Sequence, residues 1–295
     1  MTKVLCVGAA VVDFVFHLPE LPDRAEKYGT ESASIVGGGC AANAAVAVSR
    51  LGGEAILGAR LGDDAIGDMV VAGVAAEGVD CANVTRTPNA RSSYSSVYID
   101  QRGERQIVNF RGAGLKLETG WFAGLEGLGA VLTDTRRVAA AVDALALART
   151  CGIPGVLDGE APVDPGLVSL ASHAAFSMQG LRDLVPGLAP EEALQKISAE
   201  HGCWACVTDG ENGVWFTGFD SIEHIPAFAV TPVDTLGAGD IWHGAFALAL
   251  AEGQDEASAI RFASAAAALK CMRSGGRDGA PSRHDTETFL KEQDV

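Results

Sequence analysis

Residues 233–240 read VDTLGAGD and combine two carboxylates with residues that have almost no side chain. A Gly-Ala-Gly run lets the backbone approach a ligand closely. The apolar stretch IWHGAFALALA that follows predicts a helix, so Gly237, Ala238 and Gly239 would present N–H groups to an oxyanion at its start. A carboxylate repels such an anion, so Asp240 needs a separate role.

Asp240 has two interpretations at the start of a helix. It can cap the helix, because its side chain accepts a hydrogen bond from a backbone N–H. It can also act as a general base on a hydroxyl that lies beside the anion. Phosphoryl transfer to an alcohol needs both an anion cradle and a proton acceptor. The stretch therefore favours that chemistry, with the helix cap as the alternative.

Composition narrows the partners of the chain. Its 295 residues carry a formal net charge of −16 and are 48% hydrophobic, enough for a large α/β core. Such an acidic chain is poorly suited to nucleic acid or an anionic membrane surface. We find no run of about twenty apolar residues and no signal-peptide pattern, and seven scattered cysteines are typical of reduced thiols. The sequence predicts a cytoplasmic protein with no nucleic-acid or membrane partner.

The elements that must position these residues alternate along the chain. Short apolar runs such as KVLCVGA, GAVLTD and WACVTDG are typical of strands, and alanine-rich stretches between them are typical of helices. This alternation predicts an α/β fold with a mostly parallel sheet that helices cover on both faces.

Residues 14–36 and 91–111 interrupt this alternation. Both have alternating polar and apolar residues, and residues 101–104 give the second a hairpin turn. We expect a small antiparallel sheet separate from the main one. It is either a lid over the site or an extra edge hairpin.

Three motifs together resemble the PfkB/ribokinase family of carbohydrate kinases. DTLGAGD is similar to the family signature DTxGAGD. GGGCAANAAVAVSRLG at residues 37–52 resembles the N-terminal glycine motif, and VTDGENG at residues 207–213 resembles the nucleotide-side turn. The motifs occur in the family order, and the pattern spans essentially the whole chain.

The resemblance implies a ribokinase-like three-layer sandwich with a mostly parallel central sheet and a small β-sheet lid. The α/β domain that binds nucleotide and sugar would comprise residues 1–13, 37–90 and 112–295. The lid would comprise residues 14–36 and 91–111. Family lids often pair between subunits, so a homodimer through the lid is expected.

The resemblance also implies roles for individual residues. Asp240 would be the catalytic base on a sugar hydroxyl, and Gly237, Ala238 and Gly239 the anion hole for the transferring phosphoryl group. ATP would be contacted at Thr208, Gly210, Gly213 and Asp234, the last near the monovalent-cation region. The sugar hydroxyls would be held at Asp13, Gly38, Gly39 and Asn43.

One departure from the family concerns magnesium. The family usually has an NxxE motif before a helix, and the corresponding residues 177–180 here read SMQG. We therefore assign no protein ligand for the metal, and expect ATP and water to hold Mg²⁺. The expected cofactors are ATP and Mg²⁺, with K⁺ as a candidate monovalent cation.

The nature of the sugar depends on a few polar side chains. Lys27, Asn109 and Arg136 would together suit an anionic end of the substrate, although surface cations are usually only solvated. EKYG, GERQIVNF, LTDTRR and FASAAAALKCMRSGGR resemble the sulfofructose kinase branch of the family. That resemblance implies 1-phosphorylation of 6-deoxy-6-sulfofructose by ATP.

Two alternatives remain open at this point. The enzyme can be a ribokinase- or fructokinase-like kinase of a neutral sugar, or a nucleoside kinase. In a different class, the chain can be a non-catalytic sugar-binding protein on the same fold. The presence of Asp240 favours the enzyme, because a degenerate relative would be expected to lose its base.

Overall fold

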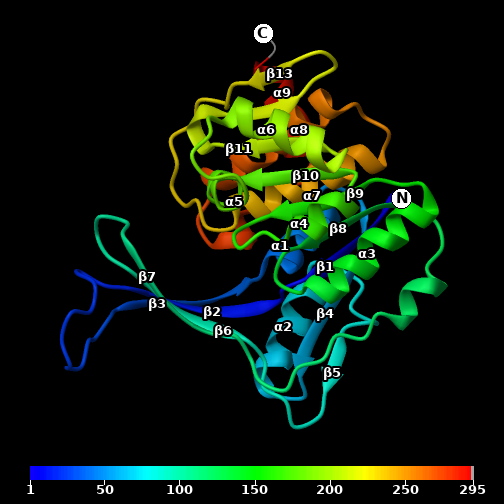
Figure 1. Ribbon diagram of the computed structural model, residues 1–295. Helices are drawn as coiled ribbons and strands as arrows, with labels where there is room; N and C mark the ends of the chain where they lie inside the picture. Colours follow the sequence, from blue (N-terminus) through cyan, green and yellow to red (C-terminus); the bar gives the residue numbers. More distant parts are fainter. Residues whose placement is uncertain (294–295) are drawn as a thin grey trace.

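A mostly parallel sheet forms the centre of the molecule in residues 1–293, the part of the chain that the computed structural model describes (Figure 1). Its nine strands in that range have the order β13-β12-β11-β10-β9-β8-β1-β4-β5. Only β12 and β13 run antiparallel to their neighbours. The strands are β1 Lys3–Gly8, β4 Glu54–Gly62, β5 Thr85–Thr87, β8 Leu128–Asp134, β9 Gly155–Gly159, β10 His173–Ser177, β11 Trp204–Thr208, β12 Val214–Thr217 and β13 Ile222–Ile225.

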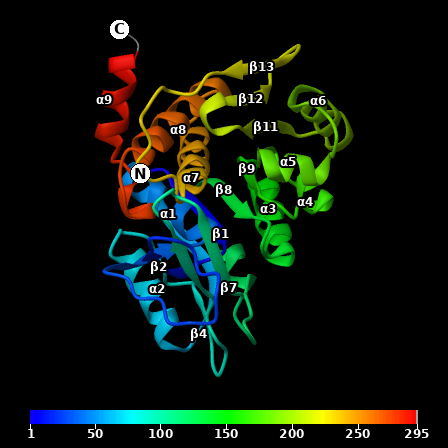
Figure 2. The ribbon, with the colours of Figure 1, turned by 90° about the vertical axis from the view of Figure 1, so that its left-hand side faces the viewer.

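Helices cover both faces of this sheet, as the alternation of strands and helices predicts (Figures 1 and 2). One layer contains α1 Cys40–Arg50, α2 Ala65–Ala75, α7 Ala238–Ala251, α8 Glu256–Cys271 and α9 Arg283–Gln293. The other contains α3 Val138–Cys151, α4 Pro165–Leu170, α5 Met178–Leu184 and α6 Pro190–His201. None of the helices in residues 1–293 is long and apolar enough to cross a membrane.

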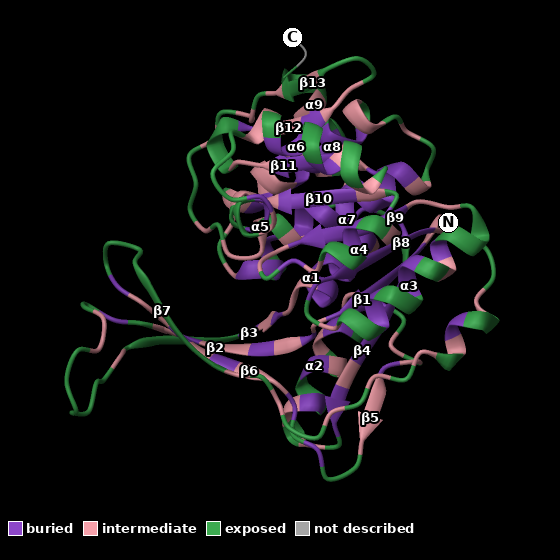
Figure 3. Ribbon diagram, in the orientation of Figure 1, coloured by how far each residue is buried: buried purple, intermediate pink, exposed green. Residues whose placement is uncertain are grey.

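Strand β1 shows how the sequence produces these layers. Side chains alternate between the two faces of a strand. Val4 and Cys6 pack in the cluster that includes α1 and α7, whereas Leu5 and Val7 pack in the cluster that includes α3. All four side chains are fully buried, and the buried residues follow the sheet through the body (Figure 3). The three-layer α/β fold is thereby confirmed.

A small sheet projects from this body (Figure 1). Its four strands in the described residues have the order β3-β2-β6-β7, with β2 Val11–His17, β3 Ser32–Gly38, β6 Tyr94–Ile99 and β7 Arg105–Phe110. The outer pairs are antiparallel, but β2 and β6 are parallel. The expected small sheet is therefore confirmed, with antiparallel outer pairs and one parallel pair at its centre. The long crossover through α1, β4, α2 and β5 returns the chain in the original direction, which places β6 parallel to β2.

One face of the small sheet packs on the loop before α7. Val15, Val36 and Val97 form a buried apolar cluster, and Leu236 of that loop packs against it. Arg105 of β7 adds a polar contact, since its guanidinium lies 3.3 Å from Thr235 Oγ1. The sheet is thus placed over residues 233–240 as a lid.

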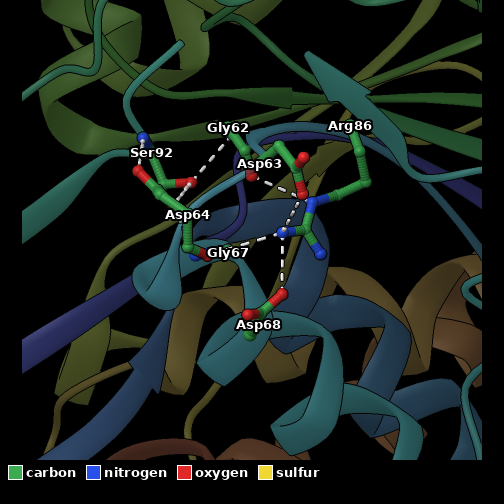
Figure 4. Close-up of polar contacts among 7 residues, drawn as sticks. All are labelled: Gly62, Asp63, Asp64, Gly67, Asp68, Arg86 and Ser92. Atoms are coloured by element: carbon green, nitrogen blue, oxygen red, sulfur yellow. Dashed lines mark hydrogen bonds and ion pairs between the residues drawn. The ribbon is translucent and has the colours of Figure 1, made fainter. Parts of the chain in front are cut away.

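A polar cluster fixes the base of the lid to the body, as Figure 4 shows. The Asp64 carboxylate caps α2 by accepting the Gly67 N–H at 2.8 Å. It also accepts hydrogen bonds from the Ser92 hydroxyl at 2.7 Å and the Ser92 N–H at 2.8 Å. Arg86 completes the cluster by donating to the Gly62 carbonyl at 2.9 Å. Ser92 stands just before β6, so one helix cap also positions the second lid segment.

Candidate active site

The turn that begins α7 brings its backbone N–H groups and Asp240 together. Gly237 is the N-cap, with φ of 76°, and no side chain caps this helix. Asp240 lies in the first turn instead, so the alternative role of Asp240 as the helix cap is wrong. A glycine suits the cap because its left-handed backbone is strained for other residues. The Asp240 carboxylate accepts a hydrogen bond of 2.7 Å from the Asn43 side-chain amide.

Two buried carboxylates lie behind Asp240. Asp134 and Asp158 are 2% and 5% exposed, and they stand at the carboxyl ends of the parallel strands β8 and β9. Asp134 accepts hydrogen bonds from the N–H groups of Ala9 at 2.6 Å and Arg136 at 2.9 Å. Ligands of open parallel sheets bind at this edge, so these carboxylates are part of the site.

The environment of Asp240 makes it a better proton acceptor than an ordinary carboxylate. Burial and the neighbouring charge of Asp158 raise the pKa of Asp240 to about 6, although the Asn43 hydrogen bond opposes the change. Burial also raises the pKa of Asp158. A base is most effective when its pKa lies near the working pH, so this geometry suits proton abstraction near neutral pH.

His243 connects Asp158 to the start of α7. Its Nδ1 atom lies 2.8 Å from the Gly239 carbonyl oxygen, and its Nε2 atom lies 3.1 Å from the Ala175 carbonyl oxygen. Nε2 is also 3.6 Å from an Asp158 carboxylate oxygen. A neutral imidazole can donate only one of these hydrogen bonds, whereas the imidazolium donates both. In that form its positive charge faces Asp158.

The residues expected at the sugar lie together beside Asp240. A Cβ atom at Gly38 would be 2.3 Å from an Asp13 carboxylate oxygen, so the backbone and this carboxylate are in close contact. Asn43 bonds Asp240, as described, and its buried Oδ1 atom has no hydrogen-bond partner among residues 1–293. A buried acceptor without a partner is costly unless a ligand satisfies it. A sugar hydroxyl would donate to it.

A row of polar side chains crosses the lid next to this pocket. Asp13, Ser95 and Asn109 are register partners on β2, β6 and β7, so they share one face. The Asn109 amide donates to the Ser95 hydroxyl at 2.9 Å, and Ser95 is hydrogen-bonded to Asp13. Asn109 is therefore connected to the sugar pocket through Ser95.

A cleft of about 840 Å³ lies on the other side of the α7 turn. Ala238 and Gly239 line it from the turn, so the cleft reaches the residues directly before Asp240. Thr208, Gly210 and Gly213 line it as the nucleotide prediction expects, whereas Asp234 is not a lining residue and only its neighbour Thr235 is. The remaining walls come from residues 227–232, from α8 (Ser264, Ala267, Ala268 and Cys271) and from Glu211, Val214 and Trp242.

The three side chains expected at an anionic end of the substrate are placed differently from one another. Arg136 lies at the carboxyl edge of the sheet and donates to the Ala161 carbonyl at 2.8 Å. Asn109 lies on the lid beside Ser95. Lys27 is in the exposed loop between β2 and β3, and no hydrogen bond or ion pair connects it to another of the described residues.

Few side chains at the site could hold a metal ion. Residues 177–180 (SMQG) contain no carboxylate. The Ser177 hydroxyl caps α5 instead, by accepting the Gly180 N–H at 3.0 Å. In residues 1–293 one group has metal-ligand spacing, namely Cys40, Asp158 and Asp240. Burial raises the pKa of the Cys40 thiol well above its usual value, and the three nearby aspartates add to this. Carboxylate oxygens suit Mg²⁺ and a protonated thiol does not, so only the two aspartates fit this ion.

Asp134, Asp158 and His243 were not singled out by the sequence motifs. A signal for the two aspartates was present, because GAVLTD and IPGVLD are both predicted strands that end in aspartate. Carboxyl ends of parallel strands meet at one edge. His243 and Lys270, which lies next to Asp234, had no comparable signal, because they are on apolar helices.

Comparison with known proteins agrees with this geometry. The pattern described as pfkB family carbohydrate kinase matches residues 1–283. The ribokinase of Bacillus subtilis (strain 168) is 30% identical over 298 residues, which cover 98% of this chain and all of the relative.

Solved structures show the same fold. A crystal structure from Agrobacterium tumefaciens, whose assignment as a ribokinase is provisional, superposes with a TM-score of 0.92 and 38% identity, covering 100% of this chain and 99% of that one. The Arabidopsis thaliana ribokinase, solved with ribose and ATP, has a TM-score of 0.86 and 23% identity, with 98% of each chain covered. The second likeness shows the fold alone.

Proposed function

The chain belongs to the pfkB family and is an ATP-dependent carbohydrate kinase, and from that premise we propose that Asp240 is its general base. The observation that carries the proposal is the position of Asp240 between the nucleotide cleft and Asn43. Its raised pKa favours acceptance of the hydroxyl proton as the γ-phosphoryl group transfers. A non-catalytic role for the chain is set aside, because the relatives are kinases.

The start of α7 supplies the electrostatic part of the mechanism. The backbone N–H groups of Gly237, Ala238 and Gly239 precede the first complete turn of the helix. The Ala238 N–H already donates to the Thr235 carbonyl at 3.2 Å, whereas N–H donors at a helix start and the helix dipole in general stabilise negative charge. We propose that they act on the charge of the transferring phosphoryl group, where fixed donors contribute most.

The sugar is held between the body and the lid in this proposal. Asp13 accepts hydrogen bonds from sugar hydroxyls, and the unpartnered Asn43 Oδ1 accepts another. Gly38 and Gly39 let the backbone approach the ring. The lid excludes water from the site, which limits hydrolysis of ATP.

Magnesium, supplied with ATP, would be held at the carboxyl edge of the sheet. Asp158 is the side chain that would face the ion, since Asp240 is kept for the proton, and Mg²⁺ usually keeps water and phosphate ligands in addition. When bound, the ion neutralises charge on the phosphates of ATP.

For the sugar we propose 6-deoxy-6-sulfofructose, phosphorylated at the 1-position. Asn109 supports this proposal because it reaches the Asp13 row through Ser95. Arg136 supports it because its guanidinium is a cation near the buried Asp134 carboxylate, in a chain whose net charge is −16. A sulfonate needs several donors and exchanges no proton near neutral pH, which fits a guanidinium, an amide and the Lys27 ammonium.

A neutral sugar is the second candidate, since the Bacillus subtilis relative is named a ribokinase. A coupled assay of ADP release with sulfofructose, fructose, fructose 6-phosphate, ribose and 2-keto-3-deoxygluconate separates the two. We expect the highest kcat/KM with sulfofructose. Preference for ribose or fructose would replace our assignment and leave the kinase mechanism intact.

A pair of arginine variants tests the anionic subsite directly. Arg136→Gln removes a charge beside the site, and Arg149→Gln removes an exposed charge on α3 that makes an equivalent bond, to the Ser169 carbonyl at 2.9 Å. We expect only Arg136→Gln, and a Lys27→Gln variant, to raise the KM for sulfofructose. An unchanged KM for sulfofructose in both Arg136→Gln and Lys27→Gln would refute the anionic subsite.

We also propose that the lid pairs with the lid of a second copy. Its outer face carries apolar side chains in water, with Ile35 57% and Val108 62% exposed. These two side chains share a row with Phe14 and Ser96, on the face opposite to Asp13. Light scattering of the parent and of an Ile35→Lys/Val108→Lys variant tests this, and a monomeric parent would contradict it.

A further inference from the structure

Lys270 is a fully buried cation whose position the phosphoryl-transfer mechanism does not by itself explain. It lies in the last turn of α8 and is 0% exposed. A lysine is almost never fully buried unless it is paired. Its partner is Asp234, the first residue of the DTLGAGD stretch.

The ammonium group contacts Asp234 twice. Nζ donates to the Asp234 carbonyl oxygen at 2.6 Å and lies 3.2 Å from the carboxylate oxygen Oδ2. One backbone oxygen and one carboxylate oxygen of the same residue thus converge on a single positive charge. Oxygen atoms that converge in this way are the ligands that K⁺ takes in proteins.

The other hydrogen-bonding positions of Asp234 are also occupied. Its Oδ1 atom accepts the Leu236 N–H at 2.9 Å, and its Oδ2 atom accepts the Gly276 N–H at 2.9 Å. Arg105 of the lid adds positive charge, with its guanidinium 3.8 Å from Oδ1. A second cation here would meet N–H donors and two positive charges, so the residues present do not fit the monovalent ion that the family resemblance implies.

Lys270 also connects to the anion cradle through a short chain of bonds. The Asp234 carboxylate holds the Leu236 N–H, and Leu236 directly precedes Gly237, the cap of α7. Backbone bonds from Val233 and Asp234 to the Cys271 carbonyl, of 2.7 and 3.0 Å, tie the same turn to the end of α8. The Lys270 ammonium therefore contacts the turn that precedes α7, and Lys270 is not a lining residue of the nucleotide cleft.

We propose that Lys270 is a positioning residue that takes the place of a bound monovalent cation, and that this kinase works without K⁺. The ammonium holds Asp234, and Asp234 holds the turn that aims the Gly237–Gly239 amides. This inference rests on the proposed function of those amides. On this proposal, Lys270 determines whether the enzyme requires K⁺.

The first experiment uses the unaltered enzyme. Its kcat and KM for ATP are measured in KCl, NaCl and tetramethylammonium chloride at equal ionic strength, with the preferred sugar. We expect changes of less than about twofold, because constant ionic strength keeps the screening equal. An enzyme that is active in KCl and loses most of its kcat in tetramethylammonium would overturn the proposal, whether or not any variant folds.

The second experiment removes the ammonium. Lys270→Ala is expected to lose about 10²-fold in kcat in tetramethylammonium, comparable with the loss of one anion-hole donor. K⁺ or NH₄⁺ can enter the vacated space, so either ion should restore part of kcat, whereas tetramethylammonium is too large to do so. Lys196→Ala is the matched control, because Lys196 is an exposed lysine on α6 that pairs across one turn with Glu200.

A readout independent of turnover separates this inference from the kinase assignment. A folded protein that binds K⁺ is stabilised by that ion in proportion to its occupancy. The Tm of Lys270→Ala should therefore rise in KCl relative to tetramethylammonium chloride, while the Tm of the parent and of Lys196→Ala should not. Full parental kcat of Lys270→Ala in tetramethylammonium, or K⁺-specific stabilisation of the parent, would contradict the inference.

Discussion

A carboxylate oxygen of Asp158 lies within 4.8 Å of one of Asp240, with Asp158 buried at the end of β9 and Asp240 in the first turn of α7. Like charges this close cannot both ionise at their ordinary pKa. This pair joins the sheet edge to the helix that begins at the anion cradle. His243 lies next to this pair, with Nε2 3.6 Å from an Asp158 carboxylate oxygen and Nδ1 2.8 Å from the Gly239 carbonyl oxygen.

Replacement of the base should affect chemistry more than binding. Asp240→Asn keeps the shape of the side chain and removes its ability to accept a proton. We expect kcat to fall by about 10²–10⁴-fold, the usual contribution of a general base. Sugar affinity measured by calorimetry should change little. Turnover equal to that of the parent would exclude Asp240 as the base.

The pH profile should report the same carboxylate. Asp240 must be deprotonated to act, and its pKa is raised to about 6, so kcat/KM should increase with pH through that region. Asp158→Asn removes the neighbouring negative charge, and the acid limb should then move to lower pH. Glu200→Gln, an exposed carboxylate on α6, should leave the profile unchanged. An acid limb that does not move in Asp158→Asn would mean that the two carboxylates are not coupled.

The row across the lid should contribute to sugar binding. Ser95→Ala removes the hydrogen bond to Asp13, and we expect kcat/KM for the sugar to fall about tenfold, the equivalent of one net hydrogen bond. Ser96 is the matched control, because adjacent side chains on a strand point to opposite faces. Equal effects of Ser95→Ala and Ser96→Ala would point to general damage of the lid.

Asp64, which caps α2 and also holds the lid, should contribute more to the free energy of unfolding than a residue that only caps a helix. Asp64→Ala removes the cap of α2 and both bonds to Ser92, and we expect a loss of about 2 kcal/mol in the free energy of unfolding. Asp255→Ala removes a cap of the same kind on α8, where the carboxylate accepts hydrogen bonds from the N–H and hydroxyl of Ser258 within the helix, and should cost less. Urea denaturation of both variants tests the difference.

This contribution of Asp64 should depend on pH in a defined direction. Burial raises the pKa of Asp64, but the bonds from Ser92 and Gly67 and the charge of Arg86 outweigh it, so the pKa in the folded state is lowered. A carboxylate with a lowered folded pKa stabilises fully above its unfolded pKa and loses this contribution as pH falls through the folded value. The parent and Asp64→Ala should therefore approach equal stability in acid.

The base of the lid should not tolerate a side chain at Gly37. A Cβ atom there would lie 1.7 Å from the Cζ atom of Arg277, which is only 4% exposed and cannot move aside freely. Gly37→Ala is expected to cost about 1–3 kcal/mol through overpacking. Gly29→Ala is the control, because nothing lies within 4 Å of a Cβ at that lid position. Equal stabilities of the two variants would place Arg277 elsewhere.

Much of the fold could be predicted from the sequence, because the sequence patterns that specify it are local. Apolar runs such as KVLCVGA and alanine-rich helices recur in alternation, and the alternation itself specifies a parallel sheet between helices. The parallel pairing of β2 with β6 was not readable, because it depends on the path of residues 39–93 between the two lid segments. Periodicity shows that a segment is a strand and does not name its neighbour.

The site divides in the same way. The sequence by itself predicted the kinase class and the proposed roles of Asp240 and the glycines before it, because these residues are contiguous and form one motif. Only the tertiary structure decided what surrounds them. Asp158 is on β9 and Lys270 is on α8, both separate from the motif in sequence. The charge of Asp158 therefore acts on Asp240, and that of Lys270 on Asp234, through space. The pKa of about 6 for Asp240 and the buried Lys270 ammonium beside Asp234 are consequences of burial and distance. Neither can be derived from one stretch of sequence.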